Sequence, residues 1–78
     1  MAKYRRKATY CDAEQFTGEP MRGVMFESGM AWVTTIQGQR VKIFPGEWVV
    51  AESDGKHFYP VANSVFQTLY EPAEAHYE

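Results

Sequence analysis

Apolar and polar residues alternate along most of this chain with the two-residue period of β-strands rather than the 3.6-residue period of helices. Residues 8–16 are the first such segment, with Tyr10, Asp12, Glu14 and Phe16 on one face. The opposite face consists of the small or weakly polar residues Thr9, Cys11, Ala13 and Gln15, and Phe16 closes the end of the strand. We expect this second face to point towards a core, because its residues are small and weakly polar.

Two further segments predict a hairpin in the middle of the chain. Residues 31–37 are rich in β-branched and aromatic side chains, which favour strands. Residues 40–44 alternate cleanly, with Val41 and Ile43 predicted to point inward. The connection around Gly38 is short and suits a tight turn.

The next segments continue the antiparallel pattern. Residues 45–46 are Pro-Gly, which favours a type II turn, because proline presets the first central position and glycine accepts positive φ at the second. Residues 48–52 are apolar enough to be covered on both sides, and residues 53–56 predict a second hairpin loop. The return strand, residues 57–61, contains Pro60, which lacks a backbone N–H and therefore predicts a sheet edge.

Helical signals are short. Asn63 is a suitable N-cap for a single turn over residues 64–68, and Tyr70 is expected to begin a last short strand. The side chains expected to pack inward from this turn are Val65, Phe66 and Leu69. Residues 20–30 allow two predictions, a short helix that begins near Pro20 or an apolar segment that caps the sheet. Their two glycines keep any helix short. The sequence therefore predicts a mainly β fold, a β-rich α+β domain. It is a single small bent antiparallel sheet, or half-closed barrel, of about five strands with one or two short helical turns.

Charge divides the chain into three parts. Four of the eight basic residues lie in residues 1–7, whereas residues 8–78 contain four basic and ten acidic residues, a net charge of −6. At 78 residues the chain has room for one domain. We therefore expect a basic arm at 1–7, a β-rich domain at 8–71 and an acidic, mobile tail at 72–78. No apolar run is long enough to cross a bilayer, so no membrane association is expected.

Signals for catalysis or a cofactor are weak. One cysteine and two histidines exclude an internal disulfide framework and do not complete a four-ligand structural zinc site. Cys11 lies among small strand residues, so we expect a buried, inert thiol. His57 follows a hairpin loop, so we expect a surface or edge histidine rather than a general base. Asp12 and Glu14 share a strand face about 7 Å apart, but we expect them to face solvent or the basic arm. No phosphate loop or nucleophile elbow is present, so we expect no enzyme, no cofactor and no metal site.

Aromatic residues are the unusual feature of the composition, at 15%. A small domain cannot hide so many rings in its core, and aromatic and arginine residues are concentrated in protein interfaces. The residues predicted to bind a partner are Tyr4, Arg5, Arg6, Trp32, Arg40, Lys42 and Phe44. Two other functions remain open. In the first, the basic residues of this set form, together with Lys7, a strip that binds single-stranded nucleic acid, although the acidic charge of the rest of the chain disfavours this binding. In the second, the chain self-associates through an edge strand.

The two ends of the chain resemble a family of small proteins encoded by tailed phages and prophages. The similarity rests on residues 3–7, 15–18 and 45–50, on Phe58-Tyr59-Pro60, and on Tyr70-Glu71-Pro72. The chain departs from the family at residues 9–11, where members have an apolar run, and at Val61, where they have cysteine.

The resemblance implies a phage accessory protein in the cytoplasm of its bacterial host, with no settled activity and no catalytic residues to carry over. Together with the aromatic surplus, it leads us to expect a protein that binds a bacterial host protein. The target is expected to be a host defence or nucleic-acid-processing complex, which the protein inhibits or redirects by steric occupation.

Overall fold

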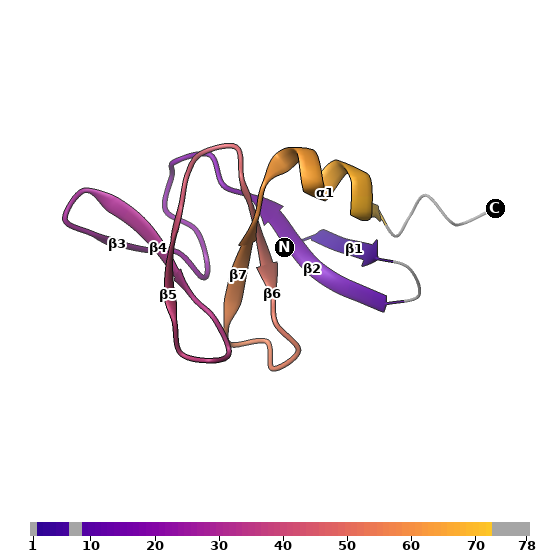
Figure 1. Ribbon diagram of the computed structural model, residues 1–78, viewed down its shortest axis with the longest axis horizontal. Helices are drawn as coiled ribbons and strands as arrows, with labels where there is room; N and C mark the ends of the chain where they lie inside the picture. The colour runs from indigo at the N-terminus through magenta and orange to yellow at the C-terminus, as the bar shows by residue number, and fades with distance from the viewer. Residues whose placement is uncertain (1, 7–8, 73–78) are drawn as a thin grey trace.

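The computed structural model, described over residues 2–6 and 9–72, consists of two antiparallel sheets and one short helix (Figure 1). The larger sheet has five strands in the order β7-β6-β2-β1-β8, and the smaller has three in the order β3-β4-β5. In chain order the elements are β1 Ala2–Arg6, β2 Thr9–Gln15, β3 Met25–Glu27, β4 Met30–Thr34, β5 Arg40–Ile43, β6 Trp48–Ala51, β7 Phe58–Val61, α1 Asn63–Leu69 and β8 Glu71–Pro72.

The predicted β-rich class is confirmed, but the strands divide between two sheets instead of one, and the fold does not close into a barrel. β7 is an edge strand of the larger sheet, as Pro60 predicts. A strand that lacks a backbone donor is a poor template for further pairing. The β3-β4-β5 unit therefore packs its face against β7 instead of extending the sheet.

Trp48, Val49 and Val50 of β6 are all buried, because this strand is covered on both sides. Val49 belongs to a core between the two sheets, whereas Trp48 and Val50 belong to a core between the larger sheet and α1. The first core consists of Phe16, Ala31, Val33, Ile43, Val49 and Phe58, and the second of Ala13, Trp48, Val50, Phe66 and Tyr70. The inward faces predicted for residues 8–16 and 40–44 are confirmed where their side chains are described.

The helix buries one residue. Phe66 stacks between Trp48 and Tyr70, with ring centroids 3.9 Å and 4.5 Å away. The prediction that Val65 and Leu69 pack inward is wrong, because a helix of seven residues turns only one narrow face to the sheet. The predicted N-cap is also wrong. Ala62 occupies that position without a side-chain bond.

The asparagine side chain next to the cap serves the core instead of the helix end. The Trp48 Nε1–H donates to Asn63 Oδ1 at 2.9 Å, which satisfies the indole of a buried ring. The bond ties the start of α1 to β6, so it fixes the helix on the sheet.

Residues 20–30 form no helix. A turn closed by the Val24 N–H donating to the Met21 carbonyl leads into the β3-β4 hairpin. The hairpin connection, Ser28-Gly29, has positive φ at both residues, 55° and 76°, as a type I′ turn requires. Such a turn matches the twist of two paired strands, and its positive φ values do not allow a helix to continue through these residues.

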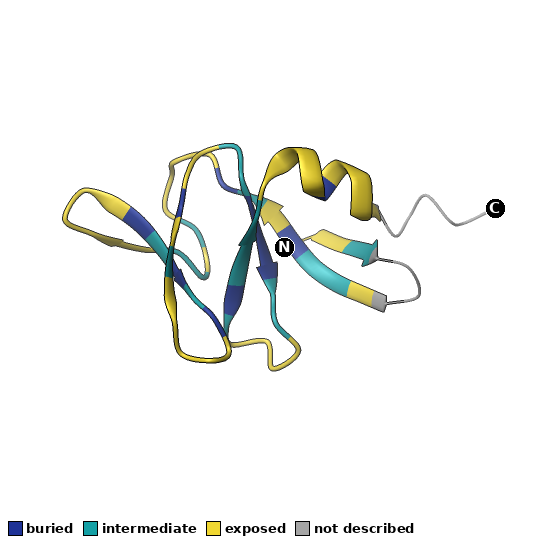
Figure 2. Cartoon of the chain, viewed as in Figure 1, coloured by how far each residue is buried: buried dark blue, intermediate teal, exposed yellow. Residues whose placement is uncertain are grey.

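The predicted basic arm is largely a strand. Residues 2–6 are β1, which pairs with β2 and β8 and contributes ion pairs from Lys3 to Asp12 and from Arg5 to Glu71. Of the predicted acidic tail at 72–78, only the backbone of Pro72 belongs to the described residues. The β1-β2 and β3-β4 hairpins lie at opposite ends of the molecule (Figure 1). Burial is concentrated where the sheets meet, and the β3-β4 tip and most of α1 are exposed (Figure 2).

Candidate functional site

The outer face of the three-stranded sheet carries the most chemically distinctive surface. Trp32 lies opposite Met25 on β3 and Lys42 on β5, so these three side chains share a face. Ala31, Val33 and Ile43 point the other way, into the core between the sheets. We call the outer surface the Trp32 face, and it consists of Met25, Glu27, Met30, Trp32, Thr34, Arg40 and Lys42.

Two cations lie against the Trp32 ring. The Arg40 guanidinium carbon is 4.8 Å from the ring centroid, and the Lys42 ammonium is 5.6 Å from it. Each contact is worth about 0.5–1 kcal/mol at an exposed site. Arg40 also pairs with Glu27, which holds its guanidinium over the ring.

A pocket of about 300 Å³ lies beside the Trp32 ring and is also lined by the β2-β3 connection and by Phe58 of β7. Its lining residues are Gly23, Val24, Met25, Trp32, Thr34, Lys56 and Phe58. Gly23 has a φ of +89°, and a Cβ at this position would lie 2.8 Å from the Phe58 ring. The absence of a side chain therefore lets the β2-β3 connection lie directly on that ring.

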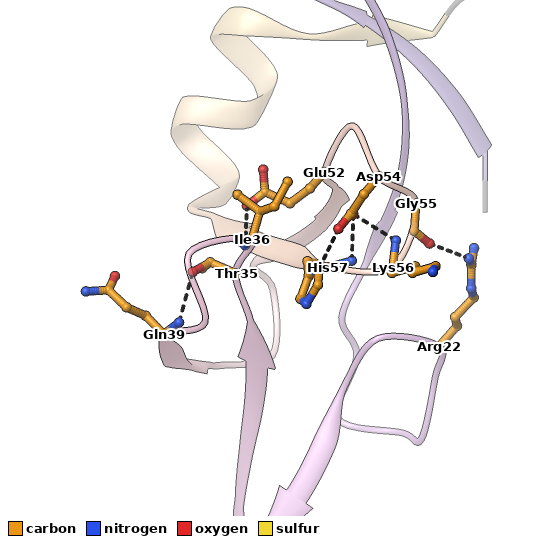
Figure 3. A network of polar contacts seen from close by, with 9 residues as sticks. All are labelled: Arg22, Thr35, Ile36, Gln39, Glu52, Asp54, Gly55, Lys56 and His57. Atoms are coloured by element: carbon orange, nitrogen blue, oxygen red, sulfur yellow. Dashed lines mark hydrogen bonds and ion pairs between the residues drawn. The ribbon is translucent and has the colours of Figure 1, made fainter.

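A third and a fourth cation lie around this pocket. Lys56 lines it directly, and the Arg22 guanidinium is 5.5 Å from the centroid of the Phe58 ring. Arg22 also donates to the Gly55 carbonyl at 2.9 Å (Figure 3). With Arg40 and Lys42, these are all four basic residues of the segment 8–78. The four basic residues of an acidic body therefore lie either over the Trp32 ring or at the pocket beside it.

Two carboxylates near these cations hold loops in place. The Asp54 side chain accepts the backbone N–H groups of Lys56 and His57 at 2.9 and 3.0 Å and also contacts the His57 ring (Figure 3). The hydrogen bond with the His57 side chain, followed by the backbone bond from Lys56, lowers the pKa of Asp54 to about 2. Glu52 accepts the Ile36 N–H at 3.2 Å and links the β4-β5 loop to the end of β6. These contacts order the hairpin loop that presents Lys56.

The residues considered for catalysis are used in packing or pairing. Cys11 is half-buried beside the helix-side core, and Asp12 pairs with Lys3 at 3.0 Å. His57 is paired with Asp54 in the hairpin loop. Within residues 2–6 and 9–72 no three His, Cys, Asp or Glu side chains are grouped to hold a metal ion.

The predicted partner-binding residues separate into two groups. Trp32, Arg40 and Lys42 meet on the Trp32 face, and exposed Phe44 follows directly after β5. Tyr4 and Arg5 lie in the other sheet, on β1. The structure therefore does not form the single basic strip that the sequence suggested.

Tyr4 and Arg5 are engaged within the larger sheet. The Tyr4 ring packs edge-on against Trp48 and Phe66, with centroids 5.4 and 4.9 Å away, so it is half-buried against the core between the larger sheet and α1. Arg5 pairs with Glu71 at 3.1 Å. The side chain of Arg6, and Lys7 as a whole, lie outside the described residues.

Sequence reasoning missed Met25, Glu27, Met30 and Thr34 on the Trp32 face, and Arg22 and Lys56 at the pocket beside it. Cross-strand register would have found Met25 and Met30, because they lie on the same face as Trp32 once the Ser28-Gly29 turn is recognised. No local signal in the sequence points to Arg22 or Lys56, since both reach the site through tertiary packing.

Comparison of the chain with protein-family models, with curated proteins and with solved structures finds no match. Among the residues that the structure describes, no helix has the length and apolar character needed to span a membrane. Inferences about function therefore come from the chemistry of the Trp32 face.

Proposed function

We propose that this protein binds another protein through the Trp32 face, and that the partner presents an acidic surface to it. One observation carries the proposal: on a chain whose net charge is −2, Arg40 and Lys42 lie over the Trp32 ring, Lys56 lines the pocket beside it, and Arg22 lies against Phe58, which lines the same pocket. Tryptophan and arginine are the residues that most often dominate binding energy in protein interfaces. Exposed methionines beside them add an adaptable apolar surface.

A protein partner fits this face better than a single-stranded nucleic acid. Binding by base stacking needs an open aromatic ring, but Arg40 and Lys42 already lie over the Trp32 ring. Glu27 neutralises part of the positive charge on the same face. The net charge of −6 over residues 8–78 also opposes binding to a phosphate backbone.

The resemblance to phage and prophage proteins supports a bacterial host protein as the partner. On this proposal the protein acts in the host cytoplasm and inhibits or redirects its target by occupying a surface that the target needs. A defence complex or a nucleic-acid-processing enzyme fits the charge requirement where it exposes an acidic patch. Steric occupation needs no catalytic group in this chain.

The test is to identify a partner and then measure its affinity. Tagged protein is used to capture partners from bacterial lysate, and a single stoichiometric partner is purified and titrated by calorimetry at several salt concentrations. We expect Lys42→Gln and Arg40→Gln each to weaken binding about tenfold, equivalent to about 1.4 kcal/mol, and to reduce its salt dependence. Lys3→Gln is the matched control, because it removes the same charge from a strand of the other sheet.

Three results would contradict the proposal. The first is equal affinity of Lys42→Gln and wild type for the partner. The second is binding of a labelled oligothymidine that weakens steeply with salt and is lost in Lys42→Gln, which makes the face a nucleic-acid site. The third is that no partner is captured and the protein forms only self-oligomers, which indicates a role in assembly.

A further inference from the structure

A second hollow opens at the β3-β4 end of the three-stranded sheet, next to the Trp32 face. It has a volume of about 250 Å³ and is mostly apolar. The lining residues that matter here are Phe16, Phe26, Met30, Lys42, Ile43 and Phe44. We call it the Phe44 groove.

The groove has a buried floor and an exposed rim. Phe16 and Ile43 form the floor and belong to the core between the sheets. Phe26, Met30 and Phe44 are exposed at the rim, and the Phe26 ring lies 6.1 Å from that of Phe16. The rim residues lack cover because the β3-β4 hairpin projects beyond the larger sheet (Figures 1 and 2).

The size of the groove selects the class of its occupant. A cavity of about 150 Å³ lined by apolar side chains holds benzene. Pockets for drug-sized ligands occupy about 300–1,000 Å³ and are more enclosed. At about 250 Å³ the groove therefore suits one aromatic or leucine-sized side chain rather than a free metabolite.

Charge adds a second requirement. Lys42 is the one charged residue among those that line the groove, and its ammonium also lies 5.6 Å from the Trp32 centroid. The groove and the Trp32 face are therefore continuous through this lysine. An occupant that enters the groove brings its neighbouring residues over Lys42, where a carboxylate is favoured.

We infer that the Phe44 groove binds one large apolar side chain of the partner, taken from a segment that carries a carboxylate next to that side chain. This inference rests on the proposed function, because it specifies the chemistry of the partner. Buried apolar anchors of this kind, set in a pocket beside charged groups, commonly supply most of the energy of an interface.

The experiment uses three short acetylated and amidated peptides as probes, followed by amide chemical shifts of the isotope-labelled protein. The first has the sequence Gly-Glu-Phe-Glu-Gly, the second replaces phenylalanine with alanine, and the third replaces both glutamates with lysine. We expect the first peptide to shift the amides of Phe26, Ile43 and Phe44 and to bind at least tenfold more tightly than either of the others.

Two variants locate the binding. Phe44→Ala removes a wall of the groove and is expected to weaken the first peptide about tenfold. Tyr10→Ala is the matched control and is expected to leave its affinity unchanged, because Tyr10 and Phe44 are both 58% exposed but lie in different parts of the fold. The amide spectrum of each variant also reports whether it is folded.

The outcomes separate the groove from the proposed function. Equal affinities of the phenylalanine and alanine peptides, both lost in Lys42→Gln, overturn the groove and leave the acidic-partner proposal standing. Equal affinities of the glutamate and lysine peptides overturn the carboxylate requirement and count against the proposed function. Shifts that map away from Phe26 and Phe44, or no shifts with any peptide at millimolar concentration, overturn the inference, while capture of a partner still tests the proposed function independently.

Discussion

Substitution of Gly23 by alanine tests whether the β2-β3 connection is held against the Phe58 ring. Gly23 has a φ of +89°, and its added Cβ would lie 2.8 Å from Phe58 Cδ1 and 2.9 Å from two further ring atoms. The ring has little freedom to move, since Phe58 is buried in the core between the sheets and carries the Arg22 guanidinium nearby. The substitution therefore combines backbone strain with a steric clash.

Gly38 provides a matched control for the backbone term. Its φ of +87° is nearly the same, but a Cβ there would have no neighbour within 4 Å. Placing an L-residue in the left-handed region costs about 1–2 kcal/mol. Overpacking a core costs about 1–3 kcal/mol more. We expect Gly38→Ala to lower the free energy of unfolding by the cost of backbone strain alone, and Gly23→Ala to lower it by the costs of backbone strain and overpacking together.

Urea unfolding followed by tryptophan fluorescence measures the difference. For a small domain with an m-value of about 1 kcal/mol/M, each kcal/mol lost from the free energy of unfolding lowers the urea midpoint by about 1 M. Gly23→Ala is therefore expected to unfold at a midpoint about 1–3 M below that of Gly38→Ala. Equal losses of stability in the two variants would refute the clash, and with it the close packing that forms the pocket beside Trp32.

Two further predictions concern polar contacts. Asn63→Ala leaves the indole N–H of buried Trp48 without its acceptor, so it is expected to lower the free energy of unfolding in urea by about 1–3 kcal/mol. Asn63→Asp retains an acceptor oxygen at this position and is expected to lower the free energy of unfolding less. A loss in Asn63→Asp as large as in the alanine variant would contradict this role. His57→Ala removes the main cause of the low pKa of Asp54, so that pKa is expected to rise from about 2 and to stay below 3.8, because the backbone N–H bonds remain. Since the folded pKa of Asp54 lies below its unfolded value, its contribution to stability is present above about pH 4 and is lost as the pH falls towards 2. Carboxyl carbon chemical shifts of wild type and variant follow this titration, and an unchanged midpoint in His57→Ala would contradict the assignment.

Much of the local structure was predictable from residue pattern. The inward face of β5, the two-sided burial of β6 and the edge position of β7 follow from side-chain alternation and from Pro60. The Pro45-Gly46 turn is also confirmed, with a φ of +99° at Gly46 and the Glu47 N–H donating to the Phe44 carbonyl at 3.0 Å. These features depend on neighbours in the chain, which a sequence displays directly.

Other elements could not be derived from the sequence because their surroundings determine them. Residues 20–30 have apolar residues at spacings that suit either a helix or a cap, and the positive φ values at Ser28 and Gly29 decide for a hairpin. Asn63 has the side chain of an N-cap, but the Trp48 indole lies within reach and takes its oxygen. The residues of the predicted basic arm become a strand because β2 and β8 both offer it pairing partners.

The sequence by itself determined the β-rich class, the β4-β5 and β6-β7 hairpins, the surplus of aromatic residues and the acidic balance of the chain. Only the tertiary structure decided which aromatics pack against the core, as Tyr4 does, and which remain on the surface, as Phe44 does. It also decided that Arg40 and Lys42 lie over Trp32, and that Lys56 and Arg22, from other parts of the chain, lie at the pocket beside it. The physical reason is that charge carries no period along a sequence. Its distribution in space follows from how the strands pair and how the two sheets pack on each other.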